Sequence, residues 1–305
     1  MDDLSDILRR LEPSLGPLSG EPVPLSGGIT NRNFRATLGG VDYVIRQPGK
    51  DTDLLGIDRR AERLATEAAA RLDIAPAVAA ALEECLVTRF IECRAVTRQD
   101  LLDGVEQIAL ALRRFHDSHT ELPTGFWVPD LLEDYAAIVR RRGGTLPGAY
   151  SGAVFAAARI AAALPVALPR PCHNDLLPGN IIRAADDGGL RIVDWEYAGM
   201  GDPRFDLGNL SINNGFDEAA DDRLLSAYHG EAPSDRGRAA LKLMRVLSDA
   251  REAAWGVVQA TVSGLDFDFN GYADEHFERL GATVVRPYFE EWLVVAGGEE
   301  SSQTA

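Results

Sequence analysis

Two short segments of the chain carry carboxylates and a carboxamide at a spacing that suits phosphoryl transfer. The first segment runs from His173 to Asn180 and contains Asp175, and the second contains Asp194. This order, H-x-D-x-x-x-x-N, is the pattern of a kinase catalytic loop. Phosphoryl transfer needs a carboxylate near the attacking hydroxyl and oxygen ligands for the Mg²⁺ that accompanies ATP. We therefore predict Asp175 as the catalytic base and Asn180 and Asp194 as the Mg²⁺ ligands.

The residues between these two segments predict a β-hairpin. Residues 181–183 and 190–193 are short runs rich in β-branched and apolar residues, and Asp186-Asp187-Gly188-Gly189 lies between them. Such a turn supplies the positive φ angles that a tight hairpin needs. The hairpin is expected to carry Asp194 back beside Asn180.

Two plainer interpretations compete with the kinase. His173 and Asp175 are either polar residues of an ordinary loop or two ligands of a hydrolytic metal site. No further histidines lie nearby to complete such a metal site. A hairpin that brings the segment of Asp175 and Asn180 next to Asp194 favours the kinase interpretation. In that interpretation His173 orients the loop through hydrogen bonds.

Composition limits the possible partners of the chain. The 305 residues are 46% hydrophobic and 26% charged, which is ordinary for a globular protein. The excess of 47 acidic over 31 basic residues gives a formal charge of −16. Binding to nucleic acid depends on lysines and arginines that neutralise phosphates, so we expect no nucleic-acid partner and no anionic membrane surface.

Cysteine usage and the N-terminus indicate a cytoplasmic protein. Cys85, Cys93 and Cys172 form no C-x-x-C pair, so neither a disulfide framework nor a zinc site is expected. The first residues are acidic where a signal peptide is basic, and no apolar run approaches the length of a membrane span. The alanine runs at 68–70, 79–81 and 156–163 are interpreted as helix formers.

The chain divides into two parts of different character, which predicts an α+β fold. Residues 1–93 form a small β-rich lobe that begins with a helix over Leu4–Leu11, ended by Pro13. It contains strands at 33–38 and 41–46, a helix at 57–72 and a strand at 86–91. Residues 94–296 form a larger helical lobe, with helices at 105–116, 131–142, 154–164, 223–229 and 234–262. Residues 297–305 have the composition of a disordered tail.

Three places in the small lobe are candidates for nucleotide binding. Ser26-Gly27-Gly28-Ile29-Thr30-Asn31 lies between strand-like runs, where a glycine loop can bring backbone amides onto phosphates. Arg46 closes a strand, from which its cation is expected to reach the α- and β-phosphates, and Glu62 on the next helix is expected to hold it. The alternative is a solvated Arg46 and a Glu62 paired with Arg59 or Arg63. Arg89, Phe90 and Ile91 precede the change in composition, so they are the expected inter-lobe connector beside the adenine.

Two further segments accompany the catalytic motif. Asp206 lies near the expected start of a helix and is predicted to cap it or to brace the catalytic loop. The stretch from Trp255 to Tyr272 concentrates aromatic residues and aspartates, among them Asp266. Aromatic faces and carboxylates attract ammonium groups, although the same rings can simply pack between helices.

Together these residues resemble the choline/ethanolamine kinase family, within the aminoglycoside-phosphotransferase and protein-kinase-like fold. The resemblance covers residues 25–280 and rests on Ser-Gly-Gly-x-x-Asn at 26–31, Arg46, Glu62, His-Asn-Asp at 173–175 with Asn180, Asp-Trp-Glu-Tyr at 194–197 and Phe-Asp-Leu-Gly-Asn at 205–209. It implies a two-lobed kinase fold, ATP and Mg²⁺ as cofactors, and phosphorylation of an amino alcohol. It also implies that Trp255 and Tyr272 belong to the choline-binding segment, and that Tyr197 stands at another position of the aromatic cage.

Two departures from this family bear on the choice of substrate. Eukaryotic members carry a second tryptophan where Glu252 stands, and an acidic residue where Asn213 or Asn214 stands. A thinner aromatic cage with an added carboxylate suits a primary amine such as ethanolamine, which forms the hydrogen bonds that choline cannot. The other interpretations are a kinase of the same fold for thiamine, an aminoglycoside or a sugar, and an inactive nucleotide-binding regulatory protein.

Overall fold

The small lobe is built on a five-stranded antiparallel sheet. The computed structural model describes residues 4–25, 31–49 and 52–298 of the chain. The strands lie in the order β1-β2-β3-β5-β4, with bounds Leu18–Leu25 for β1, Asn31–Leu38 for β2, Val41–Pro48 for β3, Val78–Leu82 for β4 and Cys85–Arg89 for β5. Helices α1 (Leu4–Leu15) and α2 (Arg59–Arg71) belong to this lobe, and the short 3₁₀ helix η1 covers Thr52–Leu55.

Three details of this lobe differ from the prediction. The first helix continues past Pro13 to Leu15, because its apolar face of Ile7, Leu8 and Leu11 packs against the sheet and Pro13 forfeits only one backbone donor near the helix end. The strand β1 was not predicted, since its glycine and prolines are tolerated only at an edge with a register shift. Ala79–Ala81 was wrongly interpreted as a helix former, because pairing with β5 overrides its propensity.

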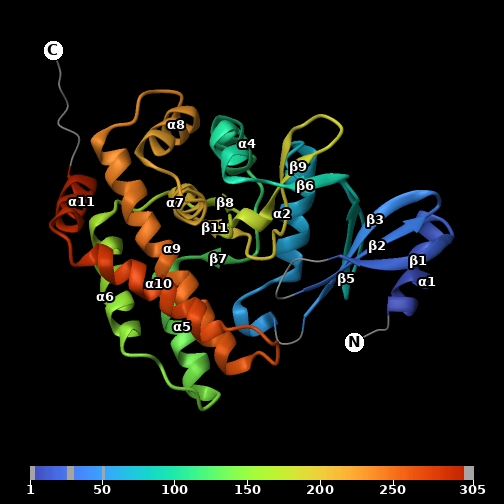
Figure 1. Ribbon diagram of the computed structural model, residues 1–305, viewed down its shortest axis with the longest axis horizontal. Helices are drawn as coiled ribbons and strands as arrows, with labels where there is room; N and C mark the ends of the chain where they lie inside the picture. The colour runs from blue at the N-terminus through green and yellow to red at the C-terminus, as the bar shows by residue number, and fades with distance from the viewer. Residues whose placement is uncertain (1–3, 26–30, 50–51, 299–305) are drawn as a thin grey trace.

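The large lobe is mainly helical and surrounds the long helix α9 (Asp235–Val262). The other helices are α3 (Arg98–Asp103), α4 (Val105–His116), α5 (Val128–Arg141), α6 (Ala149–Ala163), α7 (Pro203–Asn213), α8 (Glu218–His229), α10 (Phe269–Val284) and α11 (Pro287–Gly297). Helices α5, α6, α7, α10 and α11 all contact α9. Figure 1 shows the five-stranded sheet and α1 at one end of the molecule and this helical group at the other.

Short strands lie between the two main bodies. The expected hairpin is confirmed as β9 (Ile181–Ala184) and β10 (Leu190–Ile192), which pair in antiparallel fashion with β6 (Cys93–Ala95) on the other side of β9. Gly188 in the turn has a φ of 67°. A second small sheet joins β7 (Gly125–Phe126), β11 (Gly199–Gly201) and β8 (Arg170–Cys172). The predicted α+β, two-lobed fold is therefore confirmed.

The sequence predicted some helices of the large lobe and missed others. The expected helices at 105–116 and 234–262 are present, whereas α10 and α11 were not predicted. Of the expected tail, residues 299–305 lie outside the described residues, and Gly297 ends α11. Within the described ranges, no helix is both long and apolar enough to cross a membrane.

Helix α7 packs closely against α9 at Gly208. A Cβ atom at Gly208 of α7 would lie 2.5 Å from Cβ of Met244 and 2.7 Å from its backbone carbon in α9. We expect Gly208→Ala to push the helices apart and to lower the free energy of unfolding by about 1–3 kcal/mol. Urea unfolding measures this change.

The matched control is Gly152→Ala. Gly152 is an exposed residue in α6, and a Cβ there meets no atom within 4 Å. Alanine stabilises an open helical position by up to about 1 kcal/mol relative to glycine. Equal effects of the two substitutions would contradict the importance of the α7–α9 contact.

Candidate active site

The catalytic loop follows β8 and is buried. Residues 173–176 are at most 6% exposed, and Asn174 adopts a left-handed φ of 67°. This conformation is energetically unfavourable for a non-glycine residue. It is least unfavourable for asparagine, because its short side chain can hydrogen-bond to the nearby backbone. The Asn174 amide donates to the carbonyl oxygen of Tyr197 at 3.0 Å, so the strained turn is held by the segment between Asp194 and β11.

Helix α7 fixes the backbone of this loop through Asp206. The backbone N–H groups of His173 and Asn174 donate to the two carboxylate oxygens of Asp206 at 2.8 and 2.7 Å, and His116 Nε2 lies 2.9 Å from the same carboxylate. Burial alone would raise the pKa of Asp206, but the hydrogen bond with His116 and these N–H groups outweigh it and hold the pKa below its ordinary value. The N-cap of α7 is Asp202, so Asp206 occupies the bracing position of the two roles considered.

Two asparagines that sequence reasoning did not assign continue this brace. The backbone N–H of Leu176 donates to Asn209, and the Asn214 amide donates to the Leu176 carbonyl at 3.0 Å. Asn209 also donates to Ser248 of α9 at 2.9 Å, and Asn213 lies 3.4 Å from the same hydroxyl. The Phe-Asp-Leu-Gly-Asn pattern contained the signal for Asn209. Its backbone partner appears only in the fold.

His173 is held as a neutral imidazole by two backbone groups. Its Nε2 donates to the Val193 carbonyl at 3.0 Å, and its Nδ1 accepts from the Asp175 N–H at 3.2 Å. Because Nδ1 is an acceptor, it has no place for a second proton. Burial lowers the pKa of His173 to about 4. The side chain therefore links the catalytic loop to the end of the hairpin.

Asp175 lies beside Asn180, as the spacing requires. The Asn180 amide nitrogen donates to Asp175 Oδ2 at 2.9 Å and to the Asp175 carbonyl at 2.8 Å. Burial raises the pKa of Asp175 to about 7, although the charge of Arg251 opposes the shift. A carboxylate with a pKa near neutrality is suited to accept a proton from an alcohol.

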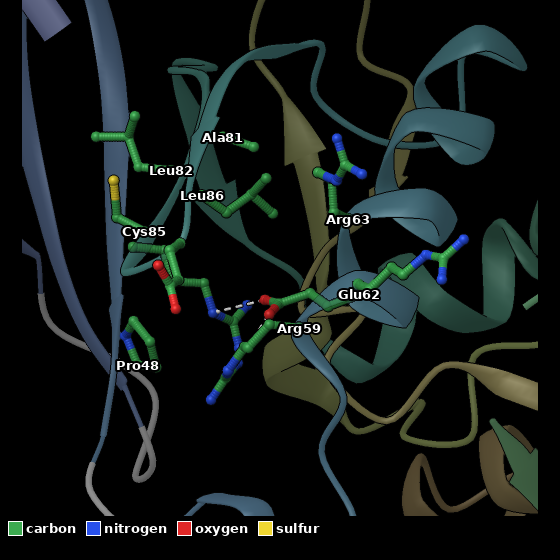
Figure 2. Close-up of a pocket in the computed structure, with 11 residues that line it drawn as sticks. Pro48, Arg59, Glu62, Arg63, Ala81, Leu82, Cys85 and Leu86 are labelled. Carbon is green, nitrogen blue, oxygen red and sulfur yellow. Dashed lines mark hydrogen bonds and ion pairs between the residues drawn. The ribbon is translucent and has the colours of Figure 1, made fainter. Parts of the chain in front are cut away.

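Arg46 joins the two lobes through three carboxylates. Its guanidinium lies 3.2 Å from Glu62 of α2 and 3.2 Å from Glu196, and it also bonds to Asp194. Arg59 adds a second cation, 2.7 Å from Glu62. Burial works against the charge of Arg46, but the carboxylates prevail and raise its pKa above the ordinary value. Figure 2 shows Glu62 reaching from α2 toward the strands, as predicted for a residue that holds Arg46.

Asn31, the last residue of the predicted glycine segment, bonds to a member of the same group. It is 8% exposed, and its amide donates to Glu196 Oε2 at 2.9 Å. Ser26, Gly27 and Gly28, the remaining predicted phosphate-binding residues, lie outside the described residues.

A cavity of about 500 Å³ opens between the lobes beside these charges. Its lining includes the predicted connector residues Arg89, Phe90 and Ile91, together with Arg46, Asn180 and Asp194. Apolar side chains from both lobes, such as Val44, Leu86, Ile182 and Val193, complete the wall. A flat base with an apolar surface and a polar edge fits such a lining.

Asn180 and Asp194 offer the oxygen donors that Mg²⁺ prefers. Asn180 uses its nitrogen toward Asp175, which leaves its carbonyl oxygen for a cation. Asp194 adopts a left-handed φ of 65°, and burial raises its pKa to about 6 while Arg46 opposes the shift. The donor set of the two residues therefore fits the ion.

The predicted acceptor residues meet on the other side of Asp175. Trp255 Nε1 donates to the Tyr197 hydroxyl at 2.8 Å, and the Trp255 and Tyr272 rings lie 5.5 Å apart. The Tyr272 hydroxyl donates to Glu252 Oε2 at 2.8 Å, and Glu252 is 1% exposed. Asp266 is exposed in the loop between α9 and α10, so the carboxylate beside these rings is Glu252 and not Asp266.

Sequence reasoning missed Arg251, which is 2% exposed in the middle of this group. Its Nη1 lies 2.9 Å from Asp175 Oδ1 and 2.8 Å from Glu252 Oε1, and its guanidinium lies over the Tyr197 ring, 4.3 Å from the centroid. Its position one helical turn before Trp255 was the available signal.

The fold and the site define a kinase-like phosphotransferase. The sequence model described as "phosphotransferase enzyme family" matches residues 21–244. The chain therefore belongs to this family, and the predicted class of enzyme is confirmed at the level of the family.

Individual relatives agree with the resemblance to choline/ethanolamine kinases. The LicA protein of Haemophilus influenzae is 28% identical over 219 residues, which cover 68% of this chain and 62% of the relative, less than two thirds of its length. A crystal structure of a choline/ethanolamine kinase family protein from Mesorhizobium loti is 29% identical with a TM-score of 0.80, and the match covers 96% of this chain and 98% of that one. A structure of LicA in complex with AMP is 25% identical with a TM-score of 0.73, covering 92% and 97%.

The neutral state of His173 predicts a dependence of stability on pH. Its folded pKa of about 4 lies below its ordinary value of 6.5. Between these values the unfolded chain binds a proton that the folded chain does not, so this contribution is present above pH 6.5 and is lost as the pH falls toward 4. The loss is on the order of 3 kcal/mol, at about 1.4 kcal/mol per unit of pKa shift.

Urea unfolding of the native chain and of His173→Asn at pH 7.5 and pH 5 isolates this contribution, because the carboxylates are common to both proteins. We expect the native chain to lose more stability than the variant between the two pH values. An equal or smaller loss would show that the imidazole is not held neutral.

Proposed function

We propose that the chain is an ATP- and Mg²⁺-dependent kinase that phosphorylates the hydroxyl of a small amino alcohol of the choline and ethanolamine class. One observation carries this proposal. Asp175 bonds on one side to Asn180, which lines the inter-lobe cavity, and on the other side to Arg251, which contacts Glu252 and Tyr197. The base thus lies between a nucleotide cavity and a group of aromatic and acidic side chains.

The nucleotide assignment rests on the cavity and on Arg46. The cavity is lined by the connector residues 89–91 and reaches Arg46, Asn180 and Asp194. We infer that the adenine lies against the connector and that the phosphates extend toward Arg46. The AMP bound to a LicA protein of the same fold is consistent with a nucleotide in this chain.

The reaction follows from these positions. The alcohol donates its proton toward Asp175, and the alcohol oxygen forms a bond to the γ-phosphorus of ATP. The bond from that phosphorus to the bridging oxygen breaks, and ADP leaves with the electron pair. Mg²⁺ held by Asn180 and Asp194 would offset the negative charge on the phosphate oxygens. Arg46 adds a cation on the same side of the site.

The amino alcohol is inferred from the side chains beyond Asp175. The rings of Tyr197, Trp255 and Tyr272 provide π-faces that attract an ammonium group. Glu252 adds a carboxylate next to them. A cytoplasmic location, where ATP is abundant, remains a prediction from the sequence.

The substitution Asp175→Asn tests this function. Asparagine keeps the shape of the side chain but cannot accept the alcohol proton, so ADP release should fall by about 100-fold or more. The assay is ADP release from ATP and Mg²⁺ with a panel of amino alcohols, together with circular dichroism to check folding.

Asp187→Asn is the matched control, because Asp187 is an exposed aspartate in the turn of the same hairpin and pairs with Arg191. Its activity should equal that of the native chain. If the native chain released no ADP with any amino alcohol, the proposed substrate class would be refuted. Release with thiamine, an aminoglycoside or a sugar instead would identify another kinase of the same fold.

A further inference from the structure

Arg251 occupies the place that a cationic substrate would need. The guanidinium lies over the Tyr197 ring, 4.3 Å from its centroid. Its Nη1 donates hydrogen bonds to Oε1 of Glu252 and to Oδ1 of Asp175. The other oxygen of Glu252 accepts from Tyr272. The aromatic face and the carboxylates that attract an ammonium group therefore already hold a cation from the chain itself.

The way Arg251 is held is typical of a site for a cation that forms few hydrogen bonds. Its Nε and Nη2 are buried without a hydrogen-bond partner among the described residues, although five N–H donors belong to a guanidinium. Only Nη1 donates hydrogen bonds, to Asp175 and Glu252. The contact with the Tyr197 ring and the charge of the carboxylates hold the rest of the guanidinium. A quaternary ammonium, which has no N–H donor, is attracted by the same two forces.

We propose that Arg251 is the resident cation of the acceptor site, and that it makes the native chain select against quaternary ammonium alcohols such as choline. Any ammonium group beside Arg251 would meet electrostatic repulsion. A primary ammonium offsets that repulsion by donating hydrogen bonds to the carboxylates, whereas a quaternary ammonium has no N–H donor and depends on the Tyr197 face, which Arg251 covers. This inference rests on the proposed function, since it assigns the selectivity of the same acceptor site. It makes Arg251 a specificity-determining residue of the site.

Substitution of Arg251 by methionine tests the assignment. Methionine fills much of the volume without charge, and it leaves Asp175 and Glu252 with no cation between them. We expect Arg251→Met to bind choline at least about tenfold more tightly than the native chain, because a desolvated cation–π contact is worth about that factor or more. Arg251→Lys keeps the charge and should bind choline as weakly as the native chain.

Binding is measured without ATP, from the change in tryptophan fluorescence and from the rise in melting temperature as choline is added. These readouts do not depend on catalysis, which the contact of Arg251 with Asp175 would also disturb. The matched control is Arg245→Met, because Arg245 lies on the same helix and is paired with Asp221 at 3.0 Å. This variant should bind choline no better than the native chain.

Each outcome decides the inference. Equal or weaker choline binding by folded Arg251→Met would overturn it, as would an equal gain in Arg245→Met. If Arg251→Met fails to fold, the native chain decides: a choline Kd weaker than about 1 mM supports the resident cation, and a tighter one refutes it.

The proposed function is tested separately, by measuring ADP release from the native chain with ethanolamine and the other amino alcohols. If none of these alcohols gave ADP release, the proposed amino alcohol kinase activity would be refuted. The choline affinity of Arg251→Met would still decide what Arg251 does.

Discussion

Neutralisation of buried carboxylates by arginine is the constraint on which the site depends. Glu62, Asp194 and Glu196 meet around Arg46, and Asp175 and Glu252 meet around Arg251. Carboxylates taken out of water are costly unless a cation and hydrogen bonds compensate them. Each arginine therefore allows acidic groups to gather where phosphoryl transfer needs them, within a chain that carries a net charge of −16.

The two arginines lie on different sides of the site, Arg46 on the nucleotide side and Arg251 on the acceptor side. Arg46 comes from β3 of the small lobe and bonds to Asp194, which follows the hairpin, and to Glu62 of α2, so it ties the lobes together on the nucleotide side. Arg251 comes from α9 and bonds to the base and to the aromatic group. Asp175 has contacts on both sides, through Asn180 and through Arg251.

Rigidity of the catalytic loop comes from side chains that bond to its backbone. Asp206, Asn209 and Asn214, all in or at the end of α7, bind the N–H and carbonyl groups of residues 173–176. A loop in a left-handed turn has no regular partners for these groups, so buried side chains must supply them. The close packing of α7 on α9 at Gly208 then places the loop relative to Trp255 and Arg251.

The sequence alone determined the α+β class, the hairpin and the kinase-type spacing of Asp175, Asn180 and Asp194, because these depend on local periodicity, turn chemistry and short separations along the chain. Long-range contacts decided the rest. The edge strands β1 and β4 form through pairing that overrides their propensity, and Arg251 meets Asp175 across 76 positions. An arginine in a helix is ordinarily solvated, so only the packing of α9 against the loop could reveal that this one is a buried cation beside the base, and that Glu252 rather than Asp266 accompanies the aromatic rings.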